Sequence, residues 1–225
     1  MDPIFAKNQK IYAEFYSKFM KTKGKDLFAM MYHKRLERNL DKKYFSLTLE
    51  LGSGRGEHFP FIKHDYDTYI QTDIMHTRIP KTLSVGEKLL KHEWLNAEDL
   101  KAYGDASVDR IVTTCLLLHL DDLPKALREW KRVLKPGGQI DLLLMCEPGI
   151  LLRLVQRFSS RRAFKKLHLN YDLWQYSEHR SYYLRARTLI TEIFSDCEVK
   201  DDLFPFPRFS WDFNLWNCIR IHSRL

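Results

Sequence analysis

The chain has 225 residues, a formal net charge of +8, and 44% hydrophobic and 13% aromatic residues. These values predict one folded domain with a full core and exclude a disordered chain. No apolar run approaches the ~18 residues that span a bilayer as a helix, which excludes an integral membrane protein of the helical kind.

Two helices are predicted before the first strand. Residues 6–22 place aromatic and aliphatic side chains on neighbouring helical faces, and residues 26–41 form a second helical segment with Asp26 as its N-cap. Strand and helix signals then alternate, which predicts a mostly parallel sheet. With the ambiguous third segment taken as a strand, the strands expected here are 46–51, 67–73, 87–95, 107–117 and 139–146.

The last third of the chain changes pattern. A helix at 121–134 ends at the KPGG sequence of residues 135–138, which turns the chain into the fifth strand. After a further helix at 184–195, two strands are expected, joined by a Pro-rich aromatic connection, at 197–204 and 215–223. A final pair of strands suggests an antiparallel edge on an otherwise parallel sheet.

The most informative stretch is the glycine turn, GSGRG at residues 52–56, which directly follows the first strand. Such a turn lets a ligand approach the backbone at the carboxyl end of a strand. Glu57 stands where the dinucleotide pattern GxGxxG needs glycine, and no GK[ST] follows, so neither an NAD site nor a P-loop is indicated. Asp73 ends the second strand about 20 residues later, where an acidic side chain can bind ribose hydroxyls.

Taken together, these motifs resemble the class I S-adenosylmethionine-dependent methyltransferases, of the Methyltransferase-11-like small-molecule or glycan type. The resemblance covers residues 47 to about 146, and its parts occur in the family's order and spacing: ELGSGRG from Glu50, Asp73, NAEDL from Asn96, VDRIVTTCLLLHL and RVLKPGG. It implies an α/β, Rossmann-like, seven-stranded mixed sheet, mostly parallel with an antiparallel last strand and helices on both faces. It also implies S-adenosyl-L-methionine as the cofactor.

The resemblance assigns cofactor roles to individual residues. Gly52, Ser53 and Gly54 would meet the methionine part, and Glu50 would orient the turn or bind the cofactor amino group through water. Asp73 would bind the ribose hydroxyls. The adenine would lie against Ile74 and the Asn96–Ala97 edge, although the family often has Asp where Asn96 stands. Cys115 and Leu116 would line the pocket beside the methionine.

Residues for catalysis and acceptor binding are less clearly marked. The motifs of amino-group nucleic-acid methyltransferases and of pyrimidine C5 methyltransferases are missing, and no metal site is expected. His119 is a candidate catalytic residue, with a packed histidine near the cofactor as the alternative. The four cysteines are scattered without a CxxC pair, so we expect neither a zinc site nor a disulfide framework.

Residues 147–187 form a basic lid, which holds nine basic and three acidic side chains and follows the fifth strand. This pattern indicates a cover over the mouth of the site or a surface that lies on anionic lipid. Within it, His179 is a candidate general base, because the reference pKa of histidine lies near neutrality. The residues expected to contact the acceptor are Tyr32, His33, Arg180 and Tyr183.

We therefore expect a single class I methyltransferase domain over residues 1–225, with a helical cap at 1–45 and the basic lid at 147–187. The expected acceptor is small or glycan-like and anionic, since the lid and the ending FPFPRFSWDFNLW also resemble methyltransferases of bacterial surface-polysaccharide biosynthesis. A phospholipid or other lipid acceptor is the main alternative. An RNA methyltransferase and a catalytically inactive partner subunit are further alternatives.

The expected location is the cytoplasm, because the first ten residues lack the basic and apolar regions of a signal peptide. The net positive charge also permits peripheral contact with an anionic membrane at its cytoplasmic face. Nucleic acid is not expected as a partner, since no appended RNA-binding module is present.

Overall fold

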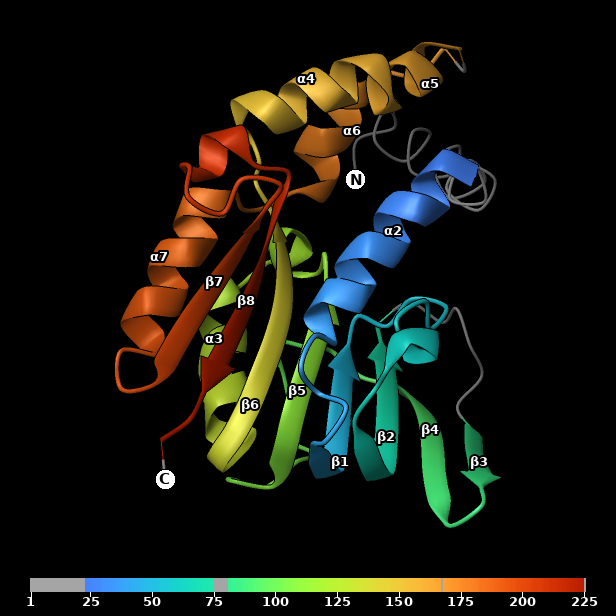
Figure 1. Cartoon of the computed structure of the whole chain (residues 1–225), viewed down its shortest axis with the longest axis vertical. Helices are drawn as coiled ribbons and strands as arrows, with labels where there is room; N and C mark the ends of the chain where they lie inside the picture. The colour runs from blue at the N-terminus through green and yellow to red at the C-terminus, as the bar shows by residue number, and fades with distance from the viewer. Residues whose placement is uncertain (1–22, 75–80, 167, 225) are drawn as a thin grey trace.

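The computed structural model describes residues 23–74, 81–166 and 168–224 (Figure 1). One eight-stranded sheet runs through the molecule in the order β3-β4-β2-β1-β5-β6-β8-β7. The strands are β1 (Tyr44–Leu51), β2 (Asp65–Asp73), β3 (Lys81–Val85), β4 (Lys88–Trp94), β5 (Val108–Thr114), β6 (Leu134–Met145), β7 (Glu198–Phe204) and β8 (Trp216–His222).

The predicted α/β sheet is confirmed, with one strand more than expected. Strands β4, β2, β1, β5 and β6 are parallel to one another, and the last strand, β8, is antiparallel to both β6 and β7. The additional strand, β3, pairs antiparallel with β4 through a two-residue turn at Gly86–Glu87. Gly86 has φ +64°, a backbone conformation that favours glycine at such a hairpin turn.

The α-helices follow the labels of Figure 1 and start at α2, because the predicted helix at 6–22 lies outside the described residues. The helix α2 spans Lys23–Leu36, so Asp26 lies inside the helix and the predicted N-cap is wrong. The remaining α-helices are α3 (Leu123–Val133), α4 (Ile150–Phe158), α5 (Ser160–Lys166), α6 (Tyr171–Glu178) and α7 (Tyr183–Ile193).

Helices cover both faces of the sheet (Figure 1). On one face, α3 and α7 pack on the main apolar core, which includes the fully buried Trp130, Ile111 and Leu142. Asp122 caps α3 by accepting a hydrogen bond from the Lys125 backbone N–H. This is the role expected of an acidic residue at a helix N-terminus.

The connection after α3 differs from the prediction. The KPGG segment belongs to β6 itself, which begins at Leu134. A Cβ on Gly138 would lie 2.8 Å from the Lys135 carbonyl oxygen and 3.0 Å from that of Asp109, so the close backbone approach requires glycine.

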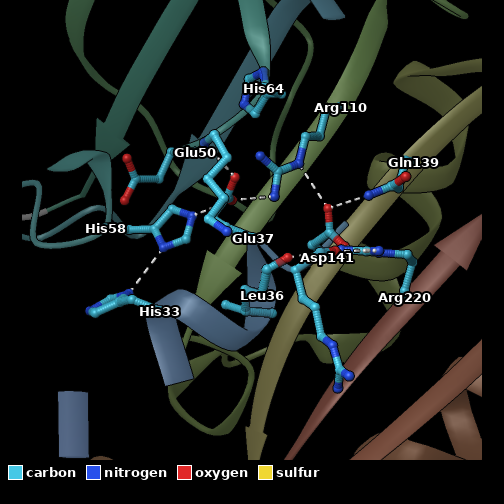
Figure 2. Close-up of polar contacts among 12 residues, drawn as sticks. His33, Leu36, Glu37, Glu50, His58, His64, Arg110, Gln139, Asp141 and Arg220 are labelled. Carbon is cyan, nitrogen blue, oxygen red and sulfur yellow. Dashed lines mark hydrogen bonds and ion pairs between the residues drawn. The ribbon is translucent and has the colours of Figure 1, made fainter. Parts of the chain in front are cut away.

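On the other face, a buried charge network joins α2 to the sheet (Figure 2). We define it as Glu37, His58, Arg110, Asp141 and Arg220. Arg110 donates from Nη2 to Glu37 Oε1 at 2.6 Å and from Nε to Asp141 Oδ2 at 2.8 Å. His58 Nε2 lies 2.9 Å from Glu37 Oε1, and Arg220 Nε donates to Asp141 at 2.6 Å. The network fixes the end of α2 on the polar centre of this face.

The segment after β6 lies above the carboxyl ends of the parallel strands (Figure 1). It contains α4, α5 and α6, and then continues into α7. Among the described residues, no helix is both long and apolar enough to cross a membrane.

Candidate active site

The glycine turn joins the ends of three strands. Gly52 and Gly54 have φ values of +66° and +54°, in the left-handed region that glycine adopts without strain. The Ser53 N–H donates to the Thr72 carbonyl at 2.8 Å, which ties the turn to β2. A Cβ on Gly52 would lie 2.9 Å from Leu116 Cδ1, so the turn also approaches the segment after β5. The turn therefore forms a narrow cradle that side chains would close.

Asp73 lies directly beside this cradle. Its Oδ2 accepts a hydrogen bond of 2.8 Å from the Gly54 N–H. The structure thus brings the last residue of β2 and the turn after β1 to one place, as the spacing predicted. Ile74, the next residue, is 64% exposed. An exposed apolar side chain here suits contact with a ring of a bound nucleoside.

The third edge of the site follows β4. Ala97 is buried, and its carbonyl oxygen accepts a hydrogen bond from Trp130 Nε1 at 2.8 Å. Asn96 is exposed, and its Oδ1 accepts from the Glu98 N–H at 2.9 Å. Trp130 therefore anchors this segment to α3, while Asn96 remains at the surface of the cleft.

The end of β5 adopts the same left-handed conformation as the glycine turn. Cys115 has φ +57°, which is uncommon for residues other than glycine. Burial, with a smaller contribution from Glu147, raises the pKa of the Cys115 thiol to about 12. A thiol with a raised pKa is a poor nucleophile at neutral pH, which agrees with the lining role expected for Cys115.

Glu50 points to the α2 face of the sheet. Its side chain is buried, and Oε2 accepts from Tyr69 Oη at 3.0 Å and from Gln71 Nε2 at 2.9 Å. Burial raises the pKa of this carboxyl group. These contacts hold Glu50 to β2, so the geometry favours the expected role in orienting the turn.

The two histidines predicted as catalytic lie together. Their ring centroids are 4.9 Å apart in an edge-to-face arrangement, although His119 and His179 are sixty residues apart in the chain. His119 Nδ1 lies 3.1 Å from the Glu178 carbonyl oxygen. Although the residue keeps an exposed edge, desolvation of the ring, followed by the effect of His179, lowers the pKa of His119 to about 4. A neutral His119 at pH 7 suits a packing or hydrogen-bonding role.

Glu147 is the partner that sequence reasoning missed. Its Oε2 lies 2.7 Å from His179 Nδ1, and its Oε1 accepts from Gln156 Nε2 at 3.0 Å. Burial opposes ionisation of Glu147, but hydrogen bonds from His179 and from two glutamines outweigh it and lower the pKa. Its position two residues after the end of β6, close to the sheet edge where Asp73 ends β2, was the signal that could have identified it.

This Glu147–His179 pair adjoins the predicted methionine end of the cofactor site. The His179 ring contacts the ring of His119, which follows the predicted lining residues Cys115 and Leu116 in the chain. The Arg180 N–H donates to the Leu118 carbonyl at 2.7 Å, which fixes the lid segment to the turn after β5. The pair therefore lies where the lid meets the carboxyl edge of the sheet.

The four predicted acceptor-binding residues are not brought together. Arg180 is exposed and forms an ion pair of 3.0 Å with Asp121. Tyr183 is buried in the core, where its hydroxyl accepts from Asn217.

The two N-terminal candidates lie on α2. His33 is buried and lies 3.0 Å from His58 through the two Nδ1 atoms. Burial, followed by His58, lowers the pKa of His33 to about 3. Tyr32 packs edge-to-face on Trp216 and belongs to the same apolar cluster as Cys115.

The glycine turn, the carboxylate at the end of β2 and the segments after β4 and β5 fit a bound S-adenosyl group. Gly52 and Gly54 leave room for the methionine part, Asp73 offers a carboxylate to the ribose, and Leu116 and Ala97 are apolar walls. One observation tests this fit. A Cβ added to Gly52 would lie only 2.9 Å from Leu116 Cδ1, so any side chain at position 52 would occupy the space left for the cofactor. Fold and site together are those expected of an α/β enzyme that binds a nucleotide cofactor, as methyltransferases do.

Comparison with known proteins agrees with this class. Residues 49–141 match a family described as a methyltransferase domain. A search of curated protein sequences finds no match. The matched residues include the glycine turn and Asp73, and the match agrees with the resemblance to class I S-adenosylmethionine-dependent methyltransferases.

Solved structures share the fold over nearly the whole chain. A chain of the complex between the Haloferax volcanii Trm112 methyltransferase activator and a methyltransferase is 14% identical, with a TM-score of 0.63 and coverage of 95% and 97% of the two chains. A Thermotoga maritima protein described as a possible histamine N-methyltransferase is 18% identical, with a TM-score of 0.60 and complete coverage of both chains. A Methanococcus maripaludis S-adenosylmethionine-dependent methyltransferase is 17% identical, with a TM-score of 0.58 and coverage of 95% and 92%.

Proposed function

We propose that this methyltransferase acts on a hydroxyl group of a small or glycan-like, anionic acceptor, with His179 as the general base. The observation that carries the proposal is the hydrogen bond of 2.7 Å between His179 Nδ1 and the buried Glu147. A carboxylate on one ring nitrogen fixes the tautomer, so that the other nitrogen is available to accept a proton.

The bound cofactor supplies an electrophilic methyl group, and the protein supplies position and a proton acceptor. His179 Nε2 takes the proton of the acceptor hydroxyl as its oxygen becomes the nucleophile. The imidazolium that forms is stabilised by Glu147 through Nδ1–H. Among the described residues, His179 Nε2 has no hydrogen-bond partner, which leaves it open to an acceptor. Gln156 holds the second oxygen of Glu147 and so fixes the carboxylate.

The charge of the lid supports an anionic acceptor. Arginine presents a fork of donors that matches a carboxylate or phosphate. Arg180 directly follows the general base in the chain, three residues before the start of α7, and its partner Asp121 is exposed. An anionic group of the acceptor would replace a surface carboxylate at this arginine. Tyr32 would form an apolar wall across the mouth.

The proposed division of the chain follows from these roles. Residues 1–45 act as a helical cap, within which α2 is held on the sheet by Glu37 and Arg110. Residues 147–187 act as a lid that supplies both members of the base pair. In this division the lid belongs to the active site, and its removal would abolish transfer without removing the cofactor cradle.

A labelled-methyl transfer screen tests the acceptor. The protein is incubated with methyl-labelled S-adenosylmethionine and with cell extract separated into glycans, small metabolites, lipids and RNA. We expect label in an anionic glycan or small-metabolite fraction, in an alkali-stable bond typical of an O-methyl ether. Label on an amine nitrogen, on RNA or in no fraction would contradict the proposed acceptor.

Two observations favour other acceptors, an amine and a lipid. The Thermotoga maritima neighbour is named for an amine substrate, so an amine acceptor is a direct competitor. The exposed apolar side chains of α4 favour a lipid or lipid-linked acceptor and a peripheral location at the cytoplasmic face of a membrane. The same screen separates these cases, because each places the label in a different fraction or bond.

A further inference from the structure

Helix α4 leaves an apolar stripe at the surface. In the structure, α4 buries Leu152 and Gln156, whereas Ile150, Leu154 and Phe158 are 60%, 52% and 65% exposed. These three residues are four apart, so they follow one face of the helix. Within the part of the chain that the structure describes, this face of α4 therefore remains largely uncovered.

A second group of exposed apolar side chains lies in the connection between β7 and β8. Phe206, Phe209 and Phe213 are 49%, 60% and 48% exposed. Their rings contact one another in sequence, with centroids 5.8 Å apart for the first pair and 6.3 Å apart for the second. Three exposed phenylalanines in mutual contact form a continuous apolar surface, which a protein in water rarely presents without a use.

The two groups adjoin at the start of α4. A Cβ on Gly149 would lie 3.2 Å from the Asp212 carbonyl oxygen, so the helix N-terminus touches the turn that carries Phe213. Figure 1 shows α4 and this C-terminal connection at the same end of the molecule, above the carboxyl ends of the strands. We define the docking surface as Ile150, Leu154, Phe158, Phe206, Phe209 and Phe213.

Basic side chains flank this docking surface. Residues 150–166 contain six basic residues and no acidic one: Arg153, Arg157, Arg161, Arg162, Lys165 and Lys166. Arg161 is bound to Asp172 at 2.5 Å. Among the described residues, Arg157, Arg162, Lys165 and Lys166 form no ion pair. The surface therefore combines exposed apolar side chains with uncompensated positive charge.

We propose that the docking surface binds an anionic lipid bilayer, with the phenylalanines and the α4 stripe at the acyl boundary and the basic residues at the headgroups. An apolar face with a basic flank is the arrangement by which helices lie in a membrane interface. A second copy of this chain fits less well, because two basic flanks would repel. RNA also fits less well, since phosphate contacts do not need six exposed apolar side chains.

This inference does not depend on the proposed acceptor, since binding to vesicles requires neither cofactor nor acceptor. It does add a consequence for the site. The lid carries Glu147 and the α4 part of the docking surface, so the active site would lie close to the membrane. An acceptor anchored in the bilayer could then reach the base without leaving the lipid.

Sedimentation with vesicles tests the inference. The full chain is mixed with vesicles of phosphatidylcholine alone or with phosphatidylserine added. We expect binding to the anionic vesicles, and a loss of about tenfold or more in the variant Leu154→Ser/Phe209→Ser. The variant Arg157→Glu/Lys165→Glu should lose about tenfold or more as well. Both pairs are exposed, so folding is checked by circular dichroism.

A matched control replaces an exposed leucine and an exposed arginine elsewhere. Leu83 is on the edge strand β3, and Arg128 is on α3. Leu83→Ser/Arg128→Glu should bind as the unmodified chain does. Raising the salt concentration from about 0.1 M to about 1 M shortens the screening length from about 10 Å to about 3 Å and should weaken binding. No sedimentation with anionic vesicles, equal loss in the control, or a stable dimer formed through this surface would overturn the inference.

Discussion

The variant His179→Asn is expected to lose about 10²- to 10⁴-fold in kcat, the range that a general base contributes. Asparagine retains an N–H close to the position of Nδ1, so the hydrogen bond to Glu147 can persist. It lacks the nitrogen that would accept the acceptor proton. Affinity for S-adenosylhomocysteine should remain close to that of the unmodified chain, because the glycine turn and Asp73 are untouched. Steady-state kinetics and a binding titration measure the two effects separately.

A second variant distinguishes catalysis from packing. Glu147→Gln should lower kcat less, by about tenfold, since it removes orientation and charge but keeps the base. A variant at His179 with normal kcat, or one that loses cofactor affinity and kcat to the same extent, would contradict the role of a base.

The variant Arg110→Met is expected to lower the free energy of unfolding by about 3–5 kcal/mol, the usual cost of breaking a buried ion pair from one side. Arg110 is fully buried and binds both Glu37 and Asp141 (Figure 2). Despite the opposing effect of burial, Arg110 and His58 hold the pKa of Glu37 well below its usual range. Removal of the guanidinium would leave two buried carboxylates with less compensation. Denaturation in urea, followed by circular dichroism, measures the change.

An exposed ion pair provides the control for Arg110. Lys88 lies 2.5 Å from Asp65, with side chains that are 42% and 59% exposed. Lys88→Met should change the free energy of unfolding much less than Arg110→Met, because water already screens this pair. If Arg110→Met cost no more than Lys88→Met, the buried charge network would not be what holds α2 on the sheet.

Much of the architecture could be predicted because its signals are local. The alternation of apolar strands and periodic helices indicated the parallel sheet, and the glycine turn with Asp73 indicated the cofactor edge. Both depend on residues that are close in sequence or that recur at the same end of successive strands. Strand β3 was missed because its five residues, KTLSV, carry no clear alternation, and its pairing depends on the turn at Gly86.

The remaining features depend on contacts between distant segments. Glu147 and His179 are thirty-two residues apart, and only the packing of the lid brings them together. Tyr183 was expected at the mouth but is inside the core, because α7 turns that face of the helix toward β8. The exposure of the α4 stripe could not be predicted from the sequence either. Periodicity identifies an apolar helix face, but it does not show whether another segment covers that face.

The most direct test of the central claim is a calorimetric titration with S-adenosylhomocysteine. The unmodified chain should bind it, and Asp73→Ala should bind about 10- to 100-fold more weakly, because the hydrogen bonds of one charged side chain are lost. Asp67→Ala, on the same strand but with an exposed carboxylate bound to Tyr44 and Ser46, should bind normally. Absence of binding by the folded, unmodified chain would contradict the assignment of this site to S-adenosylmethionine.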